Sequence, residues 1–226
     1  MTRLVSDDVA IAVVDYGMGN RRSVEKALDH IGARATVSSD PEELRRADGL
    51  IVPGVGAFPR AMRNLNELGL DELLRERVAA GTPLLGICLG MQLAFDSSSE
   101  LGGAPGLGLV PGAVAPLRAG SNKLPHIGWN EVRFAGADQD VSLRSPLLAD
   151  LPERCAFYHV HSFAPVPDHD GDIIGTAEYG ERFVTAVARG CFYGVQFHPE
   201  KSSAAGLRLL ANFARICAAA RAAIAR

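Results

Sequence analysis

The chain has 226 residues, enough for one large domain, and folding at this length buries roughly 70–75% of the unfolded surface without disulfides or metals. Its 23 basic and 26 acidic residues give a formal net charge of −3, which argues against binding to nucleic acid or a membrane surface. The four cysteines are scattered without a CxxC pair, which indicates a reducing compartment rather than a disulfide framework or a zinc site.

The first residues predict no signal peptide, because Arg3, Asp7 and Asp8 precede any apolar run. Residues 78–95 carry no charge and approach the length of a membrane span. Pro83, three glycines and a glutamine would interrupt a spanning helix there, so this stretch reads as buried core. We therefore expect a soluble, cytoplasmic protein.

Strands and helices alternate in the first part of the chain. Strands are predicted at residues 9–15, 35–37, 49–52 and 83–87, and helices at residues 24–31, 41–44, 59–65 and 71–80. This alternation is typical of a doubly wound parallel sheet, whose ligands bind at the carboxyl ends of strands. Arg22 stands where a dinucleotide fingerprint needs its third glycine, so a nucleotide site is not expected.

After residue 100 the chain becomes rich in glycine and proline, and strands follow at hairpin-like spacing. They are predicted at residues 131–134, 155–163, 173–177, 183–188 and 191–197. We expect antiparallel strands at one edge of the same sheet, within a single α/β domain over residues 1–226. An apolar stripe from residue 204 onward predicts a last helix that packs onto the sheet.

The GICLG sequence at residues 86–90 joins a predicted strand directly to a predicted helix over residues 91–95. It has the form of a nucleophile elbow, with Cys88 where the hydrolase motif has serine. Glycines suit both flanking positions, because side chains there would collide with the neighbouring strand and helix. A helix N-terminus would favour the thiolate of Cys88. The simpler reading of an isolated GxCxG is a buried cysteine in a core turn.

The segment GVQFHPE at residues 194–200 favours the catalytic reading. Pro199 restricts His198 to extended backbone, and residues two apart in an extended segment point the same way. Glu200 can then bond one imidazole nitrogen of His198 while the other nitrogen faces Cys88, if the two strands are neighbours. The alternative makes His198 a loop histidine and Glu200 a surface charge. The elbow and this segment together favour a catalytic triad.

These two segments resemble the class I (triad) glutamine amidotransferases. Four further segments are similar to the glutaminase subunits of imidazole glycerol phosphate synthases: DYGMGN at residues 15–20, PGVGAF at 53–58, LPHIGWN at 124–130 and YHVHS at 158–162. The resemblance spans residues 9–211 and implies the flavodoxin-like amidotransferase fold. It also implies that Cys88 attacks the side-chain amide of glutamine, that His198 moves the protons, and that Glu200 orients His198.

The resemblance implies an oxyanion hole that combines the Leu89 N–H with an N–H from the loop of Val55 and Gly56, after a peptide flip. It assigns glutamine binding to a further set of residues, namely Gly54, Gln92, Glu100, His161 and Ser162. Glu100 suits the ammonium group of the substrate. No cofactor and no metal are implied.

Free ammonia is a poor final product for such a site, because water protonates it and destroys its nucleophilicity. The resemblance therefore implies a separate partner, the (β/α)₈-barrel cyclase subunit of histidine biosynthesis. Residues matching the partner interface are Asn20, Trp129, Asn130 and Lys201. Trp129 is the only tryptophan, and an exposed aromatic anchor suits an interface, although a half-buried hairpin residue is an equal reading from sequence.

Two other readings stay open at this point. A stand-alone cysteine hydrolase of γ-glutamyl substrates would need no partner. A flavodoxin-like binding module would use Cys88 only as a structural residue, and its thiol would react slowly with alkylating reagents near neutral pH.

Overall fold

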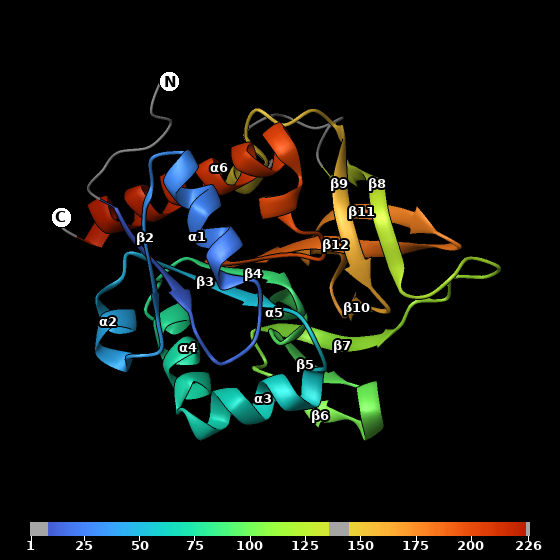
Figure 1. Cartoon of the computed structure of the whole chain (residues 1–226), viewed down its shortest axis with the longest axis horizontal. Helices are drawn as coiled ribbons and strands as arrows, with labels where there is room; N and C mark the ends of the chain where they lie inside the picture. Colours follow the sequence, from blue (N-terminus) through green and yellow to red (C-terminus); the bar gives the residue numbers. More distant parts are fainter. Residues whose placement is uncertain (1–8, 136–144, 225–226) are drawn as a thin grey trace.

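The computed structural model describes residues 9–135 and 145–224; residues 1–8, where no signal peptide was predicted, lie outside this part. Two sheets organise the fold, one of nine strands and one of four (Figure 1). The strands are β1 (Ala10–Val14), β2 (Arg34–Ser38), β3 (Gly49–Gly54), β4 (Leu84–Cys88), β5 (Phe95–Ser98), β6 (Ala104–Pro105), β7 (Val110–Pro116), β8 (His126–Phe134), β9 (Arg154–His161), β10 (Phe163–Pro167), β11 (Ile173–Tyr179), β12 (Glu181–Arg189) and β13 (Phe192–Val195). The helices are α1 (Arg21–His30), α2 (Pro41–Arg46), α3 (Phe58–Glu67), α4 (Leu70–Ala79), α5 (Leu89–Gln92) and α6 (Ser203–Ile224).

The large sheet confirms the predicted doubly wound architecture with antiparallel edge strands. Its order is β2-β1-β3-β4-β13-β12-β11-β8-β9. The strands from β2 to β13 pair in parallel, and those from β13 to β9 pair antiparallel. Strand β13 lies directly beside β4, with Gly194 opposite Gly86, so the condition for a triad is met. No helix in the described part is long and apolar enough to cross a membrane.

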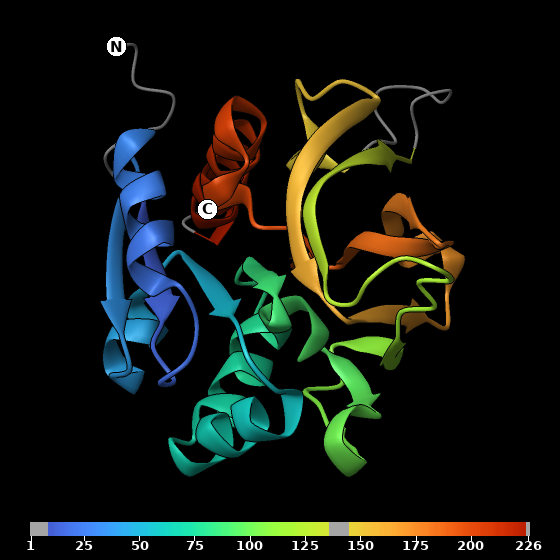
Figure 2. The ribbon, with the colours of Figure 1, turned by 45° about the vertical axis from the view of Figure 1, so that its right-hand side comes forward.

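Helices cover both faces of the parallel strands because those strands are apolar on both sides. In β1, Ile11 and Val13 belong to the core under α1 and α6, whereas Ala12 and Val14 belong to the core under α2, α3 and α4. Figures 1 and 2 show α1 and α6 together on one side, with α3 and α4 on the other. The last helix packs onto the sheet as predicted, through residues such as Leu210 and Phe213.

The small sheet, of order β10-β7-β5-β6, was not predicted from the sequence. It begins where a helix was expected: α5 ends after one turn at Gln92, and Phe95 already starts β5. The chain cannot continue as a helix because later N–H groups take its carbonyls. The Leu107 N–H donates to the Leu93 carbonyl, and the Gly108 N–H donates to the Phe95 carbonyl.

The segment predicted as one strand over residues 155–163 is two strands in two different sheets. Strand β9 ends in the large sheet at His161, and β10 starts in the small sheet at Phe163. Ser162 is the residue at which the chain changes sheets. The space between the carboxyl end of β4 and this crossing is the place for a binding pocket.

Candidate active site

Cys88 ends β4 in a strained backbone conformation, with φ 55° and ψ −113°. A non-glycine residue in this region is costly and persists only where the surroundings impose it. The flanking glycines are required as predicted: a Cβ on Gly86 would lie 2.6 Å from the Gly90 carbonyl oxygen, and one on Gly90 would overlap the Val52 carbonyl. The close packing of β3, β4 and α5 thus produces the elbow.

Helix α5 is a single turn, so its dipole is small and the argument from a helix N-terminus is weaker than the sequence suggested. What the turn does provide is the backbone of Leu89 at the first helical position. An N–H at that position has no acceptor within its own helix. It is therefore free to act on a group bound beside Cys88.

His198 and Glu200 lie together, with 2.9 Å between His198 Nδ1 and Glu200 Oε1, and both side chains are buried. His198 is extended as predicted, but Glu200 lies in a 3₁₀ turn (Pro199–Lys201), so the contact arises from this turn and not from an extended segment. The contact assigns the proton to Nδ1. Within the described residues His198 Nε2 has no hydrogen-bond partner, although it is buried.

Two opposing effects act on the pKa of His198. Burial disfavours the charged imidazolium, but the proximity of Cys88 together with the hydrogen bond and charge of Glu200 outweighs burial and raises the pKa of His198 to about 10. The imidazolium is therefore the prevailing form near neutral pH. A proton donor is thus present beside the sulfur of Cys88.

Ser202 holds the turn that carries His198, and sequence reasoning missed it. Its buried hydroxyl donates to the His198 carbonyl at 2.7 Å and accepts from the Tyr158 N–H at 3.0 Å. The His198 N–H donates in turn to the Tyr158 carbonyl at 2.8 Å. Strand β9 therefore fixes the backbone of His198 through Tyr158. The Tyr158 carbonyl bonds the His198 N–H directly, and the Tyr158 N–H acts through the Ser202 hydroxyl.

A cavity of about 220 Å³ lies in front of Cys88. It is smaller than the roughly 300–1,000 Å³ of sites for drug-sized ligands and suits a molecule the size of an amino acid. Its lining comprises Val55, Gly56, Cys88, Leu89, Gln92, Glu100, Pro125, Val160, His161, Ser162 and Phe163. All the predicted oxyanion and substrate residues line it except Gly54.

Gly54 lies behind the cavity wall. A Cβ there would come within 2.7 Å of both Leu89 Cβ and the Tyr16 hydroxyl oxygen, so tight packing requires this glycine. The Tyr16 hydroxyl also donates to the Pro53 carbonyl at 2.7 Å. The loop is therefore anchored before Val55. Gly56, with φ +109°, adopts a conformation that favours glycine.

Glu100 supplies the one carboxylate of the cavity lining. Its Oε2 accepts a hydrogen bond from the Phe58 N–H at the start of α3, at 2.8 Å. This bond fixes the carboxylate at the edge of the small sheet. A ligand with an ammonium group would find its counter-charge there.

His161 reaches the cavity at the end of a chain of neutral imidazoles. The Phe163 carbonyl accepts from His161 Nδ1 at 2.9 Å, so His161 Nε2 is an acceptor, and His126 Nδ1 lies 3.0 Å from it. His126 Nε2 then faces the Asn130 amide at 3.4 Å. Burial lowers the pKa of His126, and burial together with its histidine neighbours lowers the pKa of His161 to about 4. Among the described residues no cluster of side chains is arranged to hold a metal.

The structure places the four predicted interface residues differently. Trp129 is 54% exposed and meets Tyr158 edge-on, with ring centroids 6.2 Å apart, and Lys201 Nζ lies 5.9 Å from the Tyr158 ring centroid. We call Trp129, Tyr158 and Lys201 the aromatic patch. Asn20 precedes α1 without capping it through its side chain. Asn130 differs, because its amide bonds the Glu178 carbonyl and His126 rather than joining the patch.

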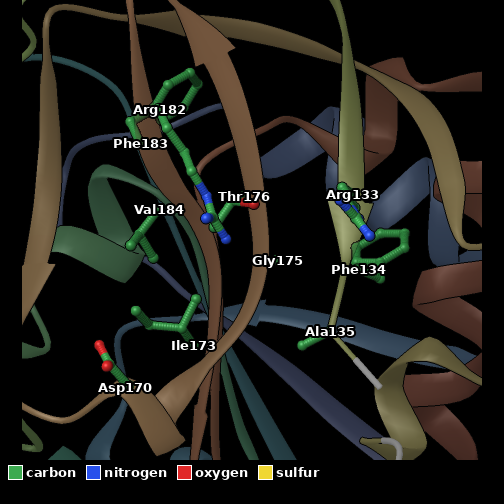
Figure 3. Close-up of a pocket in the computed structure, with 10 residues that line it drawn as sticks. All are labelled: Arg133, Phe134, Ala135, Asp170, Ile173, Gly175, Thr176, Arg182, Phe183 and Val184. Atoms are coloured by element: carbon green, nitrogen blue, oxygen red, sulfur yellow. The ribbon is translucent and has the colours of Figure 1, made fainter. Parts of the chain in front are cut away.

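A larger cavity, of about 530 Å³, lies away from Cys88 between β8, β11 and β12 (Figure 3). Its charged lining residues are Arg133, Asp170 and Arg182, and it contains neither a cysteine nor a histidine. Size alone would make it the binding site. The smaller cavity is the better candidate, because the strained Cys88 lines it and the His198 imidazolium lies next to Cys88.

The sequence matches the family model described as "Glutamine amidotransferase class-I" over residues 12–217. The chain belongs to this family. Its curated relatives include proteins named "Imidazole glycerol phosphate synthase subunit HisH". The one from Moorella thermoacetica is 49% identical and the one from Chlorobaculum tepidum 44% identical. These matches cover 91% and 90% of this chain, and 94% and 98% of the relatives.

Solved structures of low identity share the fold. A structure described as a glutamine amidotransferase gives a TM-score of 0.68 at 22% identity, covering 92% of this chain and 98% of that one. PurLQS from Thermotoga maritima gives 0.70 at 18% identity, covering 91% and 97%. As a class I glutamine amidotransferase, the chain is an enzyme, so a purely structural role for Cys88 in a binding module has no support.

Proposed function

We propose that this chain is the glutaminase subunit of an imidazole glycerol phosphate synthase. It hydrolyses glutamine to glutamate and ammonia at Cys88 and passes the ammonia to a separate cyclase subunit. The observation that carries this proposal is a strained Cys88 that lines a cavity the size of an amino acid, with the buried His198–Glu200 pair next to Cys88. Relatives that are 44–50% identical and named as that synthase's subunit support it.

The first half-reaction forms a thioester. The thiolate of Cys88 attacks the amide carbon of the glutamine side chain, and the Leu89 N–H with an N–H of Val55 or Gly56 stabilises the oxyanion. His198 gives its proton to the departing nitrogen, which leaves as ammonia. The raised pKa of His198 keeps that proton available at neutral pH.

The second half-reaction hydrolyses the thioester. His198, now neutral, takes a proton from water, and the resulting hydroxide attacks the thioester carbon. Cys88 leaves as thiolate, and glutamate is released. Glu200 keeps the imidazole oriented in both halves, since it bonds Nδ1 and leaves Nε2 toward the reacting groups. Glu100 holds the ammonium group of the substrate, and Gln92 lines the cavity beside it.

The ammonia needs an acceptor, and a partner fits the exposed surface near the site. The aromatic patch joins an exposed tryptophan to a cation, and interfaces are enriched in aromatic residues. Tyr158 links this patch to the His198 backbone. We propose that the cyclase, a (β/α)₈ barrel, docks over the patch and over Asn20, and that the complex works in the cytoplasm.

Hydroxylamine tests the thioester, because it intercepts an acyl-enzyme to give γ-glutamyl hydroxamate. We expect hydroxamate from the wild type with glutamine, and none from Cys88→Ser, whose hydroxyl is not activated as a thiolate. Cys155→Ser is the matched control, since its thiol is remote from the cavity, and it should match the wild type. Hydroxamate from Cys88→Ser above a few per cent of the wild-type amount would exclude Cys88 as the nucleophile.

A further inference from the structure

Gln196 is a buried polar residue beside the nucleophile that none of the steps above uses. It follows β13, the strand that pairs with β4, and its side chain is fully buried. Its Nε2 lies 3.5 Å from the sulfur of Cys88, within range of a hydrogen bond to sulfur. A fully buried amide needs a partner for each of its groups, so this contact requires an explanation.

The Phe163 backbone carbonyl determines the orientation of the Gln196 amide through Gln92, which bonds both. The Phe163 carbonyl can only accept, and Gln92 Nε2 lies 3.0 Å from it, so that atom of Gln92 is the NH₂ group. The other hydrogen of this NH₂ points to Gln196 Oε1 at 2.9 Å. Gln196 must therefore present its oxygen to Gln92 and its NH₂ to Cys88.

We infer that Gln196 is a positioning residue for the nucleophile: its amide donates a hydrogen bond to the sulfur of Cys88, and Gln92 and the Phe163 carbonyl hold it in the donating orientation. The inference rests on the proposed function in so far as Cys88 is the nucleophile. Gln92 then has two tasks, since it lines the cavity with one side and locks Gln196 with the other.

The donor favours the thiolate over the thiol, because a hydrogen bond to the charged form stabilises that form. The other contact of the sulfur, the Val160 carbonyl at 3.7 Å, is an acceptor and can only favour the thiol. Of the described residues, His198 and Tyr16 are the titratable groups next to Cys88, and His161 and Glu100 line the same cavity. Burial and the proximity of Cys88 raise the pKa of Tyr16, whose hydroxyl is committed to Pro53.

Two substitutions test the donor without removing the nucleophile. Gln196→Met keeps a side chain of similar length but has no donor, and Gln196→Glu replaces the NH₂ with a second carboxyl oxygen. The rate of Cys88 alkylation by iodoacetamide is measured against pH in the full chain, with Cys88 followed by peptide mass spectrometry. We expect the midpoint of the profile to rise by about one pH unit in Gln196→Met, and further in Gln196→Glu.

The controls separate this inference from a loss of folding and from the proposed function. Thr185→Val removes another buried polar group close by, on β12, that does not touch the sulfur, and it should leave the midpoint unchanged. Thermal unfolding and alkylation of the remote Cys155 show whether each variant is folded. A midpoint unchanged in both folded Gln196 variants would overturn the inference. Alkylation needs no glutamine turnover, so a failed hydroxamate test would leave this result readable.

Discussion

In the proposed mechanism His198 and Glu200 have separate roles, which single substitutions distinguish. His198→Asn should lower glutamine turnover by about 10²–10⁴-fold, because both half-reactions lose their proton carrier. Glu200→Gln should cost less, since the imidazole stays in place. It should also shift the alkaline loss of activity to lower pH, because the Glu200 carboxylate no longer raises the pKa of His198. Steady-state rates measured across pH check both; equal losses with unchanged profiles would give Glu200 a direct chemical role.

The residues that we propose as the triad could be identified from two short motifs, but the residues that support them could not. Ser202 acts through a hydroxyl that joins strand β9 to the turn carrying His198, and nothing in HPEKS indicates this. Gln196 could have been found: it lies two residues before His198, so the alternation that was applied to His198 and Glu200 also points Gln196 to the same side as His198. Gln196 was overlooked because an amide side chain takes no part in the proton transfers for which the sequence was searched.

At the scale of the elements, the elbow depends on the close packing of β3, β4 and α5, which leaves no room for a Cβ at Gly86 or Gly90. Gly90→Ala should lower the free energy of unfolding by about 3 kcal/mol, because its Cβ would overlap the Val52 carbonyl. Gly171→Ala is the matched control: nothing lies within 4 Å of its added Cβ, so its change should stay within about 0.5 kcal/mol. Urea unfolding of the two variants measures both, and equal stabilities would contradict this account of the elbow.

Strand β9 carries two buried histidines that should make the fold acid-sensitive. Burial lowers the pKa of His159 to about 3 and that of His161 to about 4. Their unfolded forms bind protons at higher pH than their folded forms, so their stabilising contribution is complete above about pH 6.5 and falls as the pH drops toward 4. At pH 5 we expect a loss of about 2 kcal/mol for each histidine relative to pH 7.

Urea unfolding of the wild type and of His159→Gln at both values of pH checks this expectation. His159 Nδ1 donates to the Phe157 carbonyl, so Nε2 accepts from the Thr185 hydroxyl at 2.8 Å, and a glutamine amide oxygen can make the same contact without titrating. The variant should therefore lose less stability between pH 7 and pH 5. An equal loss in the two proteins would exclude His159 as a source of the acid sensitivity.

Element boundaries could be predicted where local signals are strong. Asp40 followed by Pro41 is a typical helix start, and in the structure the Asp40 carboxylate accepts from the Glu42 N–H at 2.9 Å. The small sheet was missed because β5 and β6 are short and prolines interrupt the sequence patterns of β7 and β10. The sheet change at Ser162 was missed for a related reason: the apolar pattern continues through residues 155–163 although the backbone partners change.

At the scale of the whole molecule, the site opens next to the surface that we assign to the partner. Trp129 is exposed and contacts Tyr158, and the Tyr158 backbone carbonyl bonds the His198 N–H. A partner that contacts Trp129 is therefore connected to His198 through Tyr158 alone. A partner that binds one arrangement of these residues more tightly than another would shift the site toward that arrangement. Trp129→Ala should therefore weaken binding of the cyclase by about 30-fold, the effect of losing a hot spot of about 2 kcal/mol.

The most direct test of the central claim is glutamate release by this chain alone, with the cyclase subunit, and with the cyclase and its nucleotide substrate. The account predicts slow release alone and faster release in the complex, since unrestrained hydrolysis would release ammonia where no acceptor is present. Restoring one oxyanion donor would accelerate release by roughly 10²–10³-fold. Trp129→Ala should need more cyclase for the same response. Equal rates in all three mixtures would contradict the account and favour a stand-alone hydrolase.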